Sequence, residues 1–313
     1  MKKLNAKLAL GLLSLTFCLA ATAAQDAANE QGIKDSGRGL AEPSKKLSRE
    51  RIDREARQAA QESREQPVKD ALMAVQQSAQ AMEFLDKNDA KQAKAALEGA
   101  LGKMDLVLAS HPNVALVPVS AEVRIIDLNA DDARINHISS TVKDFVKQGQ
   151  YQAARLLLRD FASEIDLTAL NLPLGSYPPA IRRASKKIDQ NKLPEAKSDL
   201  LTALNSLVLT ERVTPLPIIR AQALVDEVSR QAQAGKIDKK EADVLLEDAN
   251  RQLVLAEKLG YGTRKQDFDN VLTSIKQVQA SIDKGQAPKS LLGKIEDSLK
   301  TIKDKVSRAP ASL

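Results

Sequence analysis

Residues with the types and spacing that chemistry requires are sparse in this sequence. His111 stands beside Pro112 at the end of a predicted helix and His137 lies inside another, where a cap or surface position is the ordinary role of a histidine. Asp131 and Asp132 form a carboxylate pair, but acidic residues at the start of a helix are favoured by its dipole. No zinc-binding helix motif, phosphate loop, serine elbow or dinucleotide fingerprint occurs. We therefore predict no catalytic residue, no metal site, no cofactor and no enzymatic activity.

Residues 1–24 have the order of a cleavable signal peptide. Three lysines precede an apolar run over 8–20, which is shorter than the roughly 20 residues of a membrane-spanning helix. Small residues follow, so we predict cleavage after Ala23 or Ala24 and a periplasmic protein without a stable membrane anchor. An uncleaved anchor helix is the alternative. Lipidation of Cys18 is disfavoured by the bulky Phe17 that precedes it.

The mature chain that this cleavage predicts excludes several classes of site. Cys18 is the only cysteine, so the mature chain has neither a disulfide nor a thiolate metal site. Its charge is nearly balanced, because loss of three lysines from the 47 basic residues leaves 44 against 41 acidic ones. Three tyrosines and no tryptophan offer no stacking platform for single strands. We therefore expect no nucleic-acid partner.

Helical hairpins follow a weakly apolar leader. Residues 25–48 contain glycines, a proline and scattered charges, which predicts a disordered leader, and 49–66 predicts a charged, solvated helix. Apolar residues then recur at steps of three and four on both sides of a polar turn at Asn88, which predicts an antiparallel helical hairpin. The same turn and alanine-leucine helix recur near Gln148 and near Asn191, so the hairpin is a repeated unit.

Short extended segments separate these hairpins. Aliphatic residues alternate with polar ones and a proline between Val117 and Ile125, and shorter extended runs occur farther along the chain. We predict strands near 114–128, 163–170 and 206–214, with prolines that keep them short or at an edge of the sheet.

Two apolar stripes, over 268–282 and 292–306, step by three and four, and Gly285 and Pro288 break between them. They predict a C-terminal helical hairpin over 263–308, which packs on the body or pairs with another subunit. The predicted fold class is therefore mainly α: helical hairpins with a small β element, plus a C-terminal antiparallel helical pair.

Several short sequences resemble the YfdX family of bacterial periplasmic proteins. They are LVPVSAEV at 116–123, QAARLLL at 152–158, LPL at 172–174, YP at 177–178, PEAK at 194–197 and PLPIIRAQAL at 215–224. On this resemblance we predict a YfdX-like helical domain over 49–258. The resemblance implies a mainly helical periplasmic protein associated with tolerance of acid, heat and drugs. It further implies chaperone-like or small-molecule-binding behaviour, and no assigned catalytic residue.

Three functions remain open. The leading hypothesis is a non-enzymatic, homo-oligomeric stress protein that holds unfolded or stressed periplasmic proteins on apolar faces, which acid exposes by loosening the hairpins. The alternative is a module that binds a small apolar or drug-like ligand. Its candidate surface is Tyr177 with Leu174 and Pro217, although a turn is the ordinary role of a tyrosine beside prolines. The third is an enzyme with an unrecognised site. An apolar pocket with convergent polar groups would favour the ligand.

Overall fold

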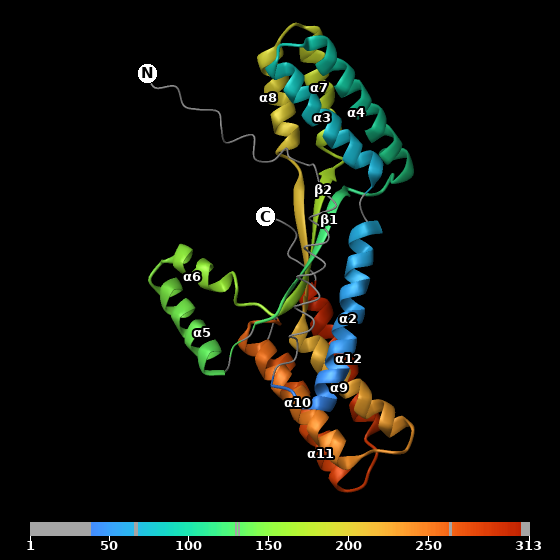
Figure 1. Cartoon of the computed structure of the whole chain (residues 1–313), viewed down its shortest axis with the longest axis vertical. Helices are drawn as coiled ribbons and strands as arrows, with labels where there is room; N and C mark the ends of the chain where they lie inside the picture. Colours follow the sequence, from blue (N-terminus) through green and yellow to red (C-terminus); the bar gives the residue numbers. More distant parts are fainter. Residues whose placement is uncertain (1–38, 66–67, 129, 131, 263–264, 308–313) are drawn as a thin grey trace.

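The computed structural model describes residues 39–65, 68–128, 130, 132–262 and 265–307. Within them the chain forms eleven helices and three strands, drawn out so that a long, narrow sheet lies between helices at both ends (Figure 1). The predicted class, mainly α with a small β element and a C-terminal helical pair, is confirmed. The predicted signal peptide, its cleavage site and residues 25–38 lie outside the described residues.

The helices form three groups. The upper bundle contains α3 (Lys69–Asp86), α4 (Ala90–Ser110), α7 (Tyr177–Asp189) and α8 (Leu193–Leu204). The lower body contains α2 (Glu42–Glu65), α9 (Leu216–Gln233), α10 (Lys239–Lys258), α11 (Lys265–Asp283) and α12 (Lys289–Ser307). A separate hairpin of α5 (Asp132–Lys147) and α6 (Tyr151–Leu158), which we call the arm, projects from the side of the molecule (Figure 1).

The repeated turn has a common backbone cause. Asn88 and Asn191 both adopt a left-handed conformation with φ of 58°, which asparagine tolerates better than most residues with a side chain. Gly149 has φ of 73° in the turn of the arm, where glycine meets no steric penalty. Asp89 then caps α4 by accepting a hydrogen bond from the backbone N–H of Gln92. The three predicted hairpins are therefore confirmed.

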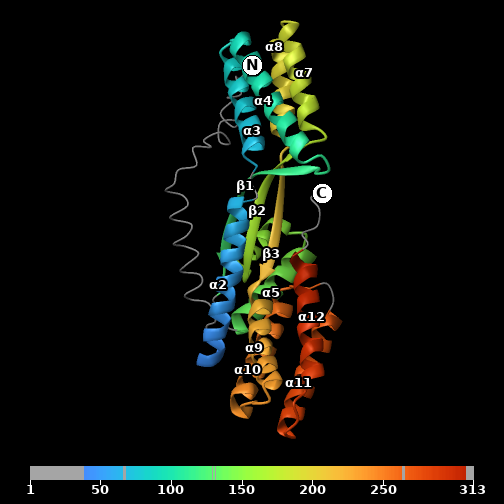
Figure 2. The ribbon, with the colours of Figure 1, turned by 90° about the vertical axis from the view of Figure 1, so that its right-hand side faces the viewer.

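The sheet is antiparallel in the order β1-β2-β3. Its strands are β1 (Leu116–Ile126), β2 (Glu164–Pro173) and β3 (Val208–Pro215), each within a few residues of its predicted range. The arm connects β1 to β2, and the α7–α8 hairpin connects β2 to β3. Viewed from the side, α2 runs beside β1 and α12 lies beside β3 (Figure 2).

Three apolar cores hold these groups together. One lies in the upper bundle, one joins α9, α10, α11 and α12, and one joins α2, the sheet and the start of α9. Ile275 and Leu299, on the two predicted C-terminal stripes, are fully buried. The C-terminal helical pair therefore packs on the body of the same chain, which was one of the two predicted arrangements, the other being pairing with another subunit. We predicted a domain boundary between residues 258 and 263. Side chains on both sides of this boundary pack in one core. Whether the two parts fold independently stays a prediction.

The predicted disordered leader is wrong over 42–48, because α2 begins at Glu42. Its buried stripe starts with Ser44 and Ser48 and continues through Ile52 and Ala56 against the sheet and α9. Small residues at helical spacing allow close approach of a second element but carry little apolar signal, which is why the sequence predicts disorder here. Among the described helices, none combines the length and apolar character needed to cross a bilayer.

Candidate functional site

The arm exposes apolar side chains. Tyr151 is 65% exposed, Leu156 58% and Leu158 48% on α6, and Val146 at the end of α5 is 46% exposed. Only Ile135 of α5 and Ala154 of α6 are buried among the described residues of the arm. Exposed apolar side chains that gather on one element can mark a site that contacts another molecule, and four of the nine large, exposed apolar side chains of the described residues lie on the arm. The arm is therefore the first candidate for an interaction site.

Packing within the arm buries only one described side chain on each of its helices. Helix α6 has eight residues, and isolated helices shorter than about 12–15 residues are marginal in water. Outside the arm, a described ion pair joins Asp132 at its start to Lys258 of α10, at 3.1 Å between exposed or half-exposed side chains, and such pairs contribute little. The contacts between α5 and α10 and the place where the arm joins the body therefore fix its position.

A buried polar cluster occupies that place, where β1 ends and β2 begins. We call Asp127, Ser163, Glu164, Asp166, Arg220 and Tyr261 the junction cluster. Arg220 of α9 donates to the carboxylate of Asp127 at 2.5 Å, and Asp127 accepts from the Ser163 hydroxyl at 2.5 Å. The Ser163 N–H donates to the Tyr261 hydroxyl at 2.8 Å. That hydroxyl donates to Glu164 Oε2 at 2.6 Å. The chain leaves for the arm at one end of this network and returns at the other.

Two of the three carboxylates in the junction cluster form ion pairs with arginines in the described structure. Arg220 is 3% exposed and pairs with Asp127, and Asp166, 2% exposed, pairs with Arg124 at 3.1 Å. No ion pair joins Glu164 to a cation in the described part of the chain. Burial raises the pKa of Glu164 to about 7, with a further rise from the neighbouring charges of Asp166 and Glu211, against the opposing hydrogen bond from Tyr261.

The buried Tyr261 hydroxyl stays protonated. Burial raises its pKa, and the adjacent Glu164 charge raises it further. It can therefore act throughout the physiological range as a donor to Glu164 and an acceptor from the Ser163 N–H. Such an arrangement orders the backbone at the junction of β1 and β2.

The sequence pattern does not predict the junction cluster, because its members come from distant parts of the chain. Glu164 and Tyr261 are 97 residues apart, and Arg220 and Asp127 are 93 apart. Glu164 and Asp166 alternate with the apolar Ile165 and Leu167 of β2. This alternation is typical of a strand with one polar face, so it gave no sign that the polar face is buried.

The three predicted interaction residues do not form one exposed surface. Tyr177 and Leu174 are buried in the core of the upper bundle, whereas Pro217 is buried in the first turn of α9. Burial raises the pKa of the Tyr177 hydroxyl to about 12, and Ser78 opposes this rise. A ligand site at these residues stays a prediction that would require the cores to open.

The structure shows where the two histidines and Asp132 lie. His111 is the C-cap residue of α4, and His137 is exposed on α5. Asp132 begins α5, as its predicted role at a helix start requires, whereas Asp131 lies outside the described residues. Within the described ranges, no group of three or more His, Cys, Asp or Glu side chains is close enough to hold a metal ion.

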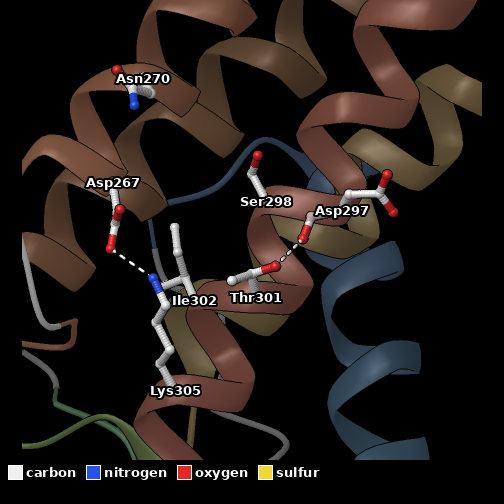
Figure 3. A pocket seen from close by; sticks show the side chains of 7 residues that line it. All are labelled: Asp267, Asn270, Asp297, Ser298, Thr301, Ile302 and Lys305. Atoms are coloured by element: carbon white, nitrogen blue, oxygen red, sulfur yellow. Dashed lines mark hydrogen bonds and ion pairs between the residues drawn. The ribbon is translucent and has the colours of Figure 1, made fainter.

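A polar hollow of about 200 Å³ lies between α11 and α12 (Figure 3). Lys305 reaches across it to Asp267 at 3.2 Å, and the Thr301 hydroxyl donates to the backbone oxygen of Asp297 at 2.8 Å. Ile302 is the single apolar side chain among its described lining residues. This lining differs from the apolar pocket expected of a drug-like ligand site.

A match to one known family lies in the part of the chain that contains most of the sheet and the arm. The model of the family described as YfdX protein matches residues 71–213. The comparison with curated proteins found no match. A solved structure of Salmonella Typhi YfdX is similar at 12% sequence identity and a TM-score of 0.33, over 47% of this chain and 91% of that one. The family match spans most of the upper bundle, the arm and most of the sheet, and ends before α9.

Proposed function

Residues 71–213 of this chain belong to the YfdX family, and from this premise we propose that the protein is a non-enzymatic, periplasmic stress-tolerance protein of the chaperone type. It holds unfolded or stressed exported proteins during exposure to acid, heat or drugs. It acts as a homo-oligomer and needs no cofactor. The stress tolerance and chaperone-like behaviour that the family resemblance implies support this proposal.

The exposed apolar side chains of the arm carry the proposal. An unfolded protein exposes apolar segments, and their burial against Tyr151, Leu156 and Leu158 removes apolar surface from water on both partners. This driving force is non-directional, so it suits clients of differing sequence. Binding requires no nucleotide, and the energy comes from the contact itself.

The alternative function, binding of a small apolar ligand, is supported by fewer structural features than the chaperone function. The polar hollow between α11 and α12 has Ile302 as the single apolar residue among its described lining residues, and the predicted residues Tyr177, Leu174 and Pro217 are buried in two separate places. We therefore take the arm, rather than a pocket, as the site of function.

A double variant of the arm tests the proposal. Tyr151→Ser with Leu158→Ser removes two exposed apolar side chains from α6 without touching its buried Ala154. The assay is light scattering from a model protein that aggregates on mild heating or acidification, with equimolar amounts of this protein. Loss of two partly buried apolar contacts costs about 2 kcal/mol of binding, so we expect at least tenfold more of the variant to be needed for equal suppression.

The matched control is Leu106→Ser in α4, which removes an apolar side chain of similar exposure, 52%, from the upper bundle. It should suppress aggregation as the wild type does. Equal suppression by the arm variant would remove the arm from the mechanism. Absence of suppression by the wild type under both stresses would reject the chaperone function and favour the ligand-binding alternative.

A further inference from the structure

Both ends of the arm meet in the junction cluster. Asp127 follows β1 just before the arm, and Ser163 and Glu164 follow the arm at the start of β2. Their partners Arg220 and Tyr261 belong to the lower body. The network, together with the contacts between α5 and α10, therefore attaches the arm to the body.

Within the described residues, Glu164 is the one carboxylate of this attachment without a cation. The groups that face it are Asp166 on its own strand, Glu211 on β3 and the Tyr261 hydroxyl after α10. The nearby arginines are already engaged, Arg124 of β1 with Asp166 and Arg220 of α9 with Asp127. A charged Glu164 is thus half-buried beside two further carboxylates.

A proton on Glu164 would remove this conflict and add a contact. Asp166 Oδ1 is buried and has no hydrogen-bond partner in the described structure. A protonated Glu164 can donate to Asp166, whereas the charged form only accepts. Tyr261 keeps its own hydrogen bond to the other side of Glu164 in either state, since a protonated carboxyl still has acceptor capacity.

We propose that the junction cluster is a proton-operated clamp, in which proton uptake by Glu164 against Asp166 and Tyr261 fixes the arm to the body as the surroundings become mildly acidic. That the clamp regulates the holding of unfolded proteins rests on the function proposed above. The clamp itself is a property of the free protein.

The sign of the effect follows from linkage. The pKa of Glu164 is about 7 in the closed junction and returns toward its ordinary 4.5 when the junction opens and Glu164 meets water. The contribution of this raised pKa to the closed form is fully present below about pH 4.5 and is lost as the pH rises from there through about 7. The clamp therefore tightens as the pH falls. This direction is opposite to the general loosening by acid that the sequence predicts, which belongs to the lower range toward pH ~3 where most carboxylates lose their charge.

Hydrogen exchange of the arm and its attachment measures the clamp. With these pKa values, the equilibrium constant for opening should fall on the order of 30-fold between pH 8 and pH 5.5. We expect peptides covering 127–164 to gain protection by that factor after correction for the intrinsic exchange rate at each pH. Peptides from α4, which contributes no residue to the junction cluster, should not follow this profile.

Glu164→Gln mimics the protonated state with a neutral side chain of the same shape. Its arm should be protected at pH 8 at least as well as the wild-type arm is at pH 5.5, with less than about a threefold change between the two pH values. Glu122→Gln is the matched control, because Glu122 is an exposed carboxylate on β1 outside the cluster, and it should keep the wild-type profile. Circular dichroism checks that both variants fold.

Wild-type protection that does not rise on acidification, or a Glu164→Gln variant that keeps the wild-type response, would overturn the clamp. If Glu164→Gln fails to fold, Asp166→Asn serves instead: loss of the neighbouring charge should lower the midpoint of the protection profile, and an unchanged midpoint would also overturn the proposal. No client is present in these measurements, so the clamp and the chaperone function fail independently. In the aggregation assay, Glu164→Gln should match at pH 8 the suppression that the wild type gives at pH 5.5.

Discussion

Replacing Leu299 with alanine tests whether the C-terminal pair packs on the body in solution. Leu299 of α12 is fully buried in the core shared by α9, α10, α11 and α12. Truncation removes apolar contacts and leaves a cavity, which costs about 2–5 kcal/mol for a buried leucine. The total stability of a domain is about 5–15 kcal/mol. We therefore expect Leu299→Ala to lower the free energy of unfolding of the lower body by about 3 kcal/mol, and Leu299→Asp, which buries an unpaired charge, to cost several kcal/mol more.

Urea unfolding followed by far-ultraviolet circular dichroism measures this loss. Ile275→Ala should show a similar loss, because Ile275 of α11 is fully buried in the same core. The matched control is Lys300→Ala, the exposed neighbour of Leu299, with an expected change below about 0.5 kcal/mol. If both core variants unfold at the wild-type midpoint, the α11–α12 pair does not pack on α9 and α10, and the reasoning is refuted.

Further predictions concern the junction cluster, two glycines and the amino terminus. Arg220→Met leaves the Asp127 carboxylate without its cation and should cost about 3 kcal/mol in chemical unfolding; an unchanged midpoint would contradict the role of this pair. Gly262→Ala should lower the melting temperature, because φ is 121° and the added Cβ would lie 2.5 Å from the ring of Phe268. Gly293→Ala, in open space within α12, should instead stabilise by about 0.5–1 kcal/mol, and a loss would show that this helix is not formed. Intact mass of protein from the periplasm should lack the predicted signal peptide and any lipid, and a mass that retains Met1 would contradict export with cleavage.

The local architecture could be predicted because its causes lie within short segments. The turn residues Asn88, Gly149 and Asn191 each follow and precede apolar residues at helical spacing, so hairpin positions are written in some twenty neighbouring residues. Strand positions followed from alternation for the same reason. The C-terminal stripes were also local, although the sequence left open what they pack against.

The predictions failed where small or polar residues lie in a buried interface. Ser44 and Ser48 of α2 are fully buried, yet serine at helical spacing has no apolar periodicity to detect. Tyr177, predicted at a surface, instead fills the upper core because α3, α4 and α8 surround the start of α7. In both cases the neighbours that cause burial are distant in the sequence.

Apart from the start of α2, the sequence by itself determined which segments are helices and strands, where the hairpins turn and which face of each helix is apolar, since these depend on the spacing of near neighbours. Only the tertiary structure decided that the arm's apolar residues stay exposed and that Glu164 meets Tyr261 and Asp166 at its base. The physical reason is that burial and pKa depend on contacts between elements. An isolated stretch of sequence carries no information on which distant element will exclude water from a given carboxylate.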